Sequence, residues 1–325
     1  MGKITTDKLP DMQKTQEGFY KKYIEKVGVG GIEVLLPIKM RDGSVQKTIA
    51  EIQSFCNLDE NTKGINMSRI NRTINKVLAE ESSGSGFQDL ERFVKELREA
   101  HQAPDVYIRA SFQLILDDKS PMSDLYSQEP VDVIIESQFK DNEYKTFLTV
   151  KSTEMSLCPC SKTMSLLTNN ITDEEAKELT TLSPKLYQKI QRSGFGAHNQ
   201  KSEITATVEL SKNSNSILWI EDIRDIIRTS SSCPSYSVLK RNDEKFVTEV
   251  SYMGGYFDDD KNFIQIDGNY GPKFVEDIIR DLACQLDKEL DKSINDYRLT
   301  CRNQESIHSE NIVALAVLTA KRDLR

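Results

Sequence analysis

Histidine and tryptophan are scarce in this chain, with three histidines and one tryptophan among 325 residues. Histidine is the side chain whose charge changes most readily near neutral pH, so each of the three is a candidate proton carrier or metal ligand. An excess of positive charge is also missing, since the net charge is −8. Proteins that bind the phosphate backbone are typically basic, and we therefore expect no nucleic acid as a partner.

Long apolar runs are absent as well. No stretch approaches the ~18 apolar residues that a membrane-spanning helix needs, and the polar residues 1–16 lack the apolar core of a secretory signal. We therefore expect a cytoplasmic protein with no membrane partner. In a reducing cytoplasm the six cysteines should be thiols, metal ligands or nucleophiles rather than disulfides.

What the chain does contain is enough apolar sequence for a sizeable globular core. Hydrophobic residues make up 38% of it and charged residues 29%, and the length suffices for two ordinary domains. In the first half, strand-like alternation brackets two segments with apolar residues at helical spacing. The elements expected in order are strands 27–40 and 45–58, helices 67–81 and 87–102, and strand-like runs 105–116 and 131–155.

The second half repeats this order loosely. Pro272 is expected at the start of its strongest helix, because proline is favoured in the first turn. The elements expected are a strand at 202–211, helices at 218–228 and 272–290, a closing hairpin of 296–306 with 311–322, and a helical insertion at 171–194. The chain thus divides into an extended lead-in (1–25), a first half (26–155) and a second half (156–325). The halves share element order but no sequence identity.

The segment SLCPCSK holds Cys158 and Cys160 with only Pro159 between them. We expect an extended segment whose two thiols divide between pocket and core rather than chelating one metal, since C-P-C is not the C-x-x-C spacing of a zinc knuckle or a thioredoxin. One working thiol is then expected. The alternative is that both are small buried hydrophobic residues.

His198 lies in GFGAHNQKS, among glycines and amides. This polar setting favours a ligand or proton carrier over a core histidine, although a lone histidine is commonly structural. A thiolate, an imidazole and a carboxylate together would form a catalytic metal site with an open position for water. The candidate carboxylates are Glu244 and Glu249 in LKRNDEKFVTEVSY.

A further acid, Glu276, stands near the start of a helix in FVEDIIRD. It either stabilises the helix start or accepts the N1–H and 2-amino protons of a guanine-type ring. Four cations could hold a triphosphate, although each could equally be a solvated surface residue: Lys162, Lys201, Lys240 and Arg241.

Five motifs occur together and in a fixed order: KGINMSR, SLCPCSK, GAHNQKS, VLKRNDEKFVTE and FVEDIIRDLA. As a set, with the early LPDMQ and VGVGGIE, they resemble the type IB GTP cyclohydrolases, and the resemblance spans about residues 8–320. It implies an α+β tunnelling fold (T-fold), an antiparallel sheet with helices on one face, with ββααββ given twice. It also implies a homotetramer with active sites at the subunit interfaces.

The resemblance also implies a reaction. The family opens the imidazole ring of GTP, releases C8 as formate and makes 7,8-dihydroneopterin triphosphate, a precursor in folate and related pterin or queuosine biosynthesis. Archaeal relatives make the 2′,3′-cyclic phosphate instead. The cofactor is a divalent metal such as Zn²⁺, Mn²⁺ or Fe²⁺.

Matched motif by motif, the resemblance assigns roles to single residues. Cys158 and His198 would be catalytic and would bind the metal with Glu249 as the acidic ligand. Glu276 would anchor guanine. The remaining substrate-binding residues would be Lys201, Lys240 and Arg241.

The chain departs from the family pattern in three places. Asn66 replaces a histidine in GIHMSR, Lys201 replaces an arginine in GAHNQRS, and the gap between the cysteine and histidine motifs is long. Two other functions stay open. A T-fold nitrile reductase of deazaguanine synthesis would need NADPH and no metal, and an inactive purine-binding T-fold protein would turn over nothing.

Overall fold

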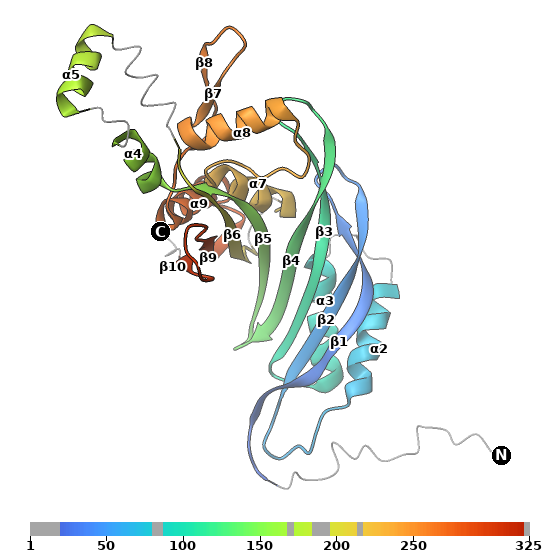
Figure 1. Ribbon diagram of the computed structural model, residues 1–325. Coiled ribbons are helices and arrows are strands. Elements are labelled where there is room, and N and C mark those ends of the chain that lie inside the picture. The colour runs from blue at the N-terminus through green and yellow to red at the C-terminus, as the bar shows by residue number, and fades with distance from the viewer. Residues whose placement is uncertain (1–19, 80–86, 168–171, 184–195, 213–216, 322–325) are drawn as a thin grey trace, which may run out of the picture. The chain divides into compact units, whose positions relative to one another are not determined.

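The computed structural model describes residues 20–79, 87–167, 172–183, 196–212 and 217–321 (Figure 1). The chain folds into two compact units. The first unit comprises Met1–Leu114 with Val133–Leu148, and the second comprises Ile115–Asp132 with Thr149–Arg325. Within the described ranges, no helix is long and apolar enough to cross a membrane.

The first unit is a sheet with two helices packed against it. Strands β1 (Ile24–Lys39) and β2 (Val45–Leu58) form the expected antiparallel hairpin, and β2 pairs antiparallel with β3 (Val106–Lys119). Helices α2 (Met67–Ala79) and α3 (Phe87–His101) lie alongside these strands (Figure 1). Apolar side chains of both layers meet in one core, which includes Leu36, Ile52, Ile74, Val77, Leu90, Phe93 and Ile108.

Two details of the first half differ from expectation. The run 131–155 is not one strand but two, β4 (Tyr126–Lys140) and β5 (Glu143–Leu157). Asp141 and Asn142 separate them and both have positive φ, 53° and 63°, as the two central residues of a tight hairpin turn require. Met67, whose spacing predicts a place on the packed face of its helix, is 40% exposed because it is the first residue of α2.

The second unit contains the rest of the sheet. Its strand order is β3-β4-β5-β6-β9-β10, and β9 pairs antiparallel with both β6 and β10, which confirms the closing hairpin. Helices α7 and α9 bury apolar faces that include Ile223, Ile227, Ile278 and Leu282. The bounds are β6 (Asn199–Leu210), α7 (Ile220–Ser230), α9 (Val275–Glu289), β9 (Ile294–Gln304) and β10 (Val313–Lys321).

Other elements of the second half are only partly as expected. The motif LKRNDEKFVTEVSY is a helix, α8 (Arg241–Met253), and a small hairpin of β7 (Gly255–Phe257) and β8 (Phe263–Gln265) follows it (Figure 1). Pro272 lies before α9 rather than within its first turn. The insertion is helical over α5 (Asp173–Leu182), and its residues 184–194 lie outside the described ranges.

Helices α7, α8 and α9 begin in the same way. An aspartate in the first turn accepts a hydrogen bond from the backbone N–H of the residue just before the helix, at 3.0 Å from Trp219 to Asp222, 2.8 Å from Lys240 to Asp243 and 3.0 Å from Phe274 to Asp277. Each bond satisfies one backbone donor at a helix start. The starts of α8 and α9, where the candidate site residues Lys240, Arg241 and Glu276 lie, are thereby fixed.

Candidate functional site

Cys158 stands at the junction between β5 and helix α4 (Pro159–Leu167). The segment is therefore not extended, contrary to the expectation from its sequence, because Pro159 is already the first residue of the helix, where proline is favoured. The backbone N–H of Ser161 points at the Cys158 sulfur at 3.4 Å. Cys158 is half-buried, whereas Cys160 is exposed, so the two thiols have different surroundings although the reason differs from the one expected.

The other cysteines fall into two groups. Cys56, Cys233 and Cys301 are buried, and burial raises the pKa of their thiols to about 11, about 12 and about 12 respectively. They are protonated at neutral pH and shielded from reactants, which excludes them as nucleophiles. Cys284 is exposed, on α9.

His198 lies directly beside Cys158. The backbone N–H of Cys158 donates to the carbonyl oxygen of His198 at 3.2 Å, and the backbone N–H of His198 donates to Ser161 Oγ at 3.3 Å. The imidazole Nδ1 is 3.4 Å from Ser306 Oγ, and that hydroxyl donates to the carbonyl of Asn199 at 2.9 Å. Two motifs 40 residues apart are thus joined in one place, with the β9–β10 loop against them.

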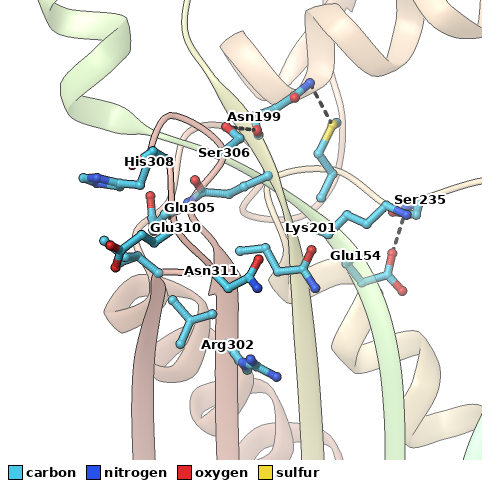
Figure 2. Close-up of a pocket in the computed structure, with 16 residues that line it drawn as sticks. Glu154, Asn199, Lys201, Ser235, Arg302, Glu305, Ser306, His308, Glu310 and Asn311 are labelled. Carbon is cyan, nitrogen blue, oxygen red and sulfur yellow. Dashed lines mark hydrogen bonds between the residues drawn. The ribbon is translucent and has the colours of Figure 1, made fainter.

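A cavity of about 800 Å³ (Figure 2) is lined by Asn199 and Ser306, which adjoin this junction, but not by Cys158 or His198. Its walls come from the end of β5, the start of β6, the loop around Ser235 and the β9–β10 loop. Lys201 is one of its lining residues, and Gln200 Nε2 donates to Glu305 Oε1 at 3.3 Å in its wall. The cavity is polar and carries both signs of charge.

Several lining residues were not identified from the sequence, among them the titratable residues Glu154, Glu305 and His308. For His308 the signal was present, because it is one of only three histidines and follows Glu305 in the polar stretch NQESIH. Imidazole and carboxylate are both common ligands of divalent metals. Within the described part of the chain, however, no three histidine, cysteine or acidic side chains gather closely enough to hold a metal ion.

The acid expected in the metal site, Glu249, lies on α8. Its Oε2 accepts the backbone N–H of Phe257 at 3.1 Å and is 3.8 Å from Lys245 Nζ. These contacts direct the carboxylate toward the β7–β8 hairpin. The alternative acid, Glu244, is exposed in the first turn of α8.

The remaining substrate-binding candidates lie at helix starts outside the cavity wall. Glu276 is exposed in the first turn of α9. The pKa of the Cys301 thiol is raised mainly by burial and, to a smaller extent, by the negative charge of Glu276. Lys240 and Arg241 are exposed at the start of α8. Lys162 differs from them, because its Nζ donates to the carbonyl of Tyr252 and burial lowers its pKa.

Asn66 stands in the first unit just before α2. Its Oδ1 accepts the Ser68 hydroxyl at 2.6 Å, and its carbonyl accepts the N–H of Arg69 at 3.0 Å. Asparagine is a favoured residue at this position of a helix. Asn66 also lines a second cavity, of about 360 Å³, together with Asp59, Arg69 and His101.

Comparison with known proteins decides the family. The model for "Type I GTP cyclohydrolase folE2" matches residues 9–314. The chain belongs to the GTP cyclohydrolase FolE2 family. Its FolE2 relatives include the GTP cyclohydrolase FolE2 of Magnetococcus marinus, 31% identical over 94% of both chains, and that of Aromatoleum aromaticum, 31% identical over 94% of this chain and 93% of the other.

The fold has more distant likenesses. The crystal structure of uricase from Arthrobacter globiformis superposes with a TM-score of 0.51 over 93% of this chain and 94% of the uricase, at 10% identity. At that identity the likeness concerns the fold alone. It agrees with the expected α+β class and its large antiparallel sheet.

Glu154 is a titrating group in the wall of the FolE2 cavity. It is fully buried, and burial raises the pKa of its carboxyl to about 7, against the opposing influence of Arg228. Because the pKa of Glu154 is raised in the folded state, its contribution to the free energy of unfolding is fully present below pH 4.5. That contribution is lost as the pH rises through 7.

Glu154→Gln should therefore stabilise the protein in a pH-dependent way. The uncharged amide avoids the cost of ionising a buried carboxyl, so the gain in free energy of unfolding should be about 2 kcal/mol larger at pH 8 than at pH 5. Urea unfolding of both proteins at the two pH values measures this difference. An equal effect at both pH values would show that Glu154 titrates normally.

Proposed function

We propose that this chain is a metal-dependent GTP cyclohydrolase that hydrolyses the guanine imidazole ring of GTP, releases C8 as formate and forms 7,8-dihydroneopterin triphosphate. One observation carries the proposal. Cys158 and His198, from two separate family motifs, are hydrogen-bonded through their backbones beside a polar cavity of about 800 Å³. Membership of the FolE2 family supports the same reaction.

The metal site is proposed to consist of Cys158, His198 and Glu249. A thiolate and an imidazole suit Zn²⁺ or Fe²⁺, and the carboxylate extends the choice to Mn²⁺. The backbones of Cys158 and His198 are hydrogen-bonded to each other, whereas the Glu249 carboxylate is engaged with the Phe257 N–H and would have to leave it. Within the described residues no three such side chains are close enough to hold a metal ion as they stand. A bound divalent metal would supply a water of lowered pKa as the nucleophile.

The protein's own groups would then orient GTP and move protons. A first water adds to C8 and the bond from C8 to N9 breaks, which leaves a formamide on N7. A second water hydrolyses this formamide and releases formate, and the opened ribose then rearranges and closes on N7 with loss of one water to form the pterin ring. Each bond cleavage at nitrogen needs a proton. We assign its transfer to Cys158 or to His198 Nε2, because the contact with Ser306 engages the other ring nitrogen. Glu276 would hold the guanine edge, and Lys201, Lys240 and Arg241 the triphosphate.

The proposed fold type, enzyme type and oligomeric state rest on the motifs and on the order of helices and strands. The first half runs β1-β2-α2-α3-β3-β4, which supports a T-fold, and the likeness to uricase is consistent with that fold. In the second half, α8 and the β7–β8 hairpin stand between α7 and α9. We propose type IB, a cytoplasmic homotetramer with sites at subunit interfaces, and GTP as the substrate.

The test is to incubate metal-free protein anaerobically with GTP and, separately, with Mn²⁺, Zn²⁺ or Fe²⁺. Formate release and the fluorescence of oxidised pterins are followed. We expect formate with at least one metal and none without metal. Chromatography of the pterin separates the triphosphate from a cyclic phosphate. GTP-binding protein that releases no formate with any metal would contradict the proposal and point to an inactive purine-binding protein with Asn66 in the family histidine's place.

A further inference from the structure

Glu154 is held at both carboxylate oxygens at the end of β5. Oε1 accepts the Ser152 hydroxyl at 2.6 Å. Oε2 accepts the backbone N–H of Ser235 at 2.7 Å (Figure 2). Glu154 and Ser235 both line the cavity. The carboxylate therefore binds the backbone of a residue in the cavity wall.

The other backbone group of Ser235 is held from the opposite side. Its carbonyl accepts Arg228 Nη2 at 2.9 Å. Arg228, on α7, is only 7% exposed, is bound to Asp118 at 2.8 Å and lies 3.6 Å from Glu129. The N–H and the carbonyl of Ser235 are thus both hydrogen-bonded to buried ionisable side chains, and the permanently charged Arg228 makes a stronger hydrogen bond than a neutral donor would.

The backbone that precedes Ser235, at Ser232 and Cys233, is also hydrogen-bonded to β5. The N–H of Ser232 donates to the Met155 carbonyl at 3.0 Å, the N–H of Met155 donates to the Cys233 carbonyl at 3.3 Å, and the N–H of Leu157 donates to Ser232 Oγ at 3.1 Å. The loop is thereby attached to Met155 and Leu157, which lead to Cys158. A displacement of the loop at Ser235 would alter the cavity next to the proposed catalytic thiol.

Holding a loop with buried ionisable side chains carries a desolvation penalty. Replacing a buried ionic cluster by apolar residues is often neutral or stabilising. Glu154, Arg228, Asp118 and Glu129 together place charges in the interior, where well-packed apolar side chains would serve stability as well. What apolar residues could not supply is directed hydrogen bonds to both sides of one peptide residue.

We propose that Glu154 and Arg228 are positioning residues, which fix Ser235 in the cavity wall and so set the shape of the site that receives the purine nucleotide. The proposal rests on the proposed function for its substrate. Neither side chain is assigned a contact with the nucleotide, so their effect is exerted through the Ser235 backbone. We refer to Glu154, Arg228 and the backbone of Ser235 together as the clamp.

Two substitutions at one position separate hydrogen bonding from charge. In Glu154→Gln, the amide oxygen can accept the Ser235 N–H while the amide nitrogen donates to Ser152, whose hydroxyl already reaches Glu129 at 3.3 Å. In Glu154→Val, neither bond can form. Ser237→Ala is the matched control, because Ser237 lies in the same loop and its exposed hydroxyl contacts only the Gln128 carbonyl among the bonds described.

Formate release from GTP and amide hydrogen exchange are measured for each variant. Glu154→Val should lower kcat/KM about 10- to 100-fold, the scale of effect of a small misplacement in an active site, and the Ser235 amide should exchange faster. Glu154→Gln should stay within about threefold of the unmodified protein in both readouts, as should Ser237→Ala. Arg228→Met should resemble Glu154→Val in kcat/KM.

Each result decides the proposal. Unchanged exchange at Ser235 in Glu154→Val would overturn the clamp, and faster exchange with unchanged kcat and KM would overturn its role in the site. Glu154→Gln as impaired as Glu154→Val would also contradict it. Should Glu154→Val fail to fold, Ser152→Ala replaces it and should give a smaller change in the same direction. If the unmodified protein turns over no GTP, the proposed function fails, and exchange still tests the clamp.

Discussion

Cys158→Ala should abolish GTP turnover, with a loss of at least about a thousandfold in kcat, because it removes both a proposed metal ligand and a proton-transfer group. The thiol is half-buried at the start of α4, with the Ser161 N–H directed at its sulfur, and it is joined to His198 through the backbone. The residual rate of formate release measures the effect. Bound metal, determined by elemental analysis of the same protein, should fall with it.

Cys160→Ala is the matched control for this experiment. Cys160 is exposed in the first turn of α4, so its loss should change neither turnover nor metal content by more than about twofold and should cost little stability. Equal losses in the two variants would contradict the assignment of a single working thiol. Full activity in Cys158→Ala would remove that residue from the chemistry.

Glu276→Gln should weaken GTP binding by about 10- to 100-fold, since a hydrogen bond to a charged group contributes about 1.5–3 kcal/mol. In the proposed complex the Glu276 carboxylate accepts two hydrogen bonds from guanine, one at each oxygen. The amide of glutamine can accept only one of them, through its single oxygen. Glu276 is exposed in the first turn of α9. Equilibrium binding of GTP measures the change, while metal content should stay the same.

The control is the same substitution at the other end of the same helix. Glu289 is the last residue of α9 and is exposed, and Glu289→Gln should leave GTP affinity unchanged. Unchanged affinity in Glu276→Gln would remove Glu276 from the site. Weaker binding together with loss of metal would assign it to the metal site instead.

The parts of the fold that local periodicity encodes could be predicted from the sequence. Both terminal hairpins and helices α2, α3, α7 and α9 follow from the spacing of their apolar residues. Helix α8 could not be predicted in the same way, because its start depends on Asp243. The Asp243 carboxylate also accepts the backbone N–H groups of Met122 and Ser123, which are 121 and 120 residues away. Such a contact leaves no local pattern.

The candidate site was only partly predictable for the same reason. The motifs identified Cys158 and His198, but the order of residues did not show that the chain would turn helical at Pro159. Glu154 has no motif, and its environment is assembled from Arg228 and Glu129, which are far from it in sequence. His308 could have been noticed by its rarity, whereas its place beside the cavity depends on the β9–β10 loop.

The central claim is that this chain removes C8 of GTP as formate. The most direct measurement supplies GTP isotopically labelled at C8, with the protein and its best metal under anaerobic conditions, and follows the label by NMR. The account predicts that the label leaves in formate and that one formate appears for each pterin formed. Label retained in a purine or in any larger product, with GTP bound and metal present, would contradict it.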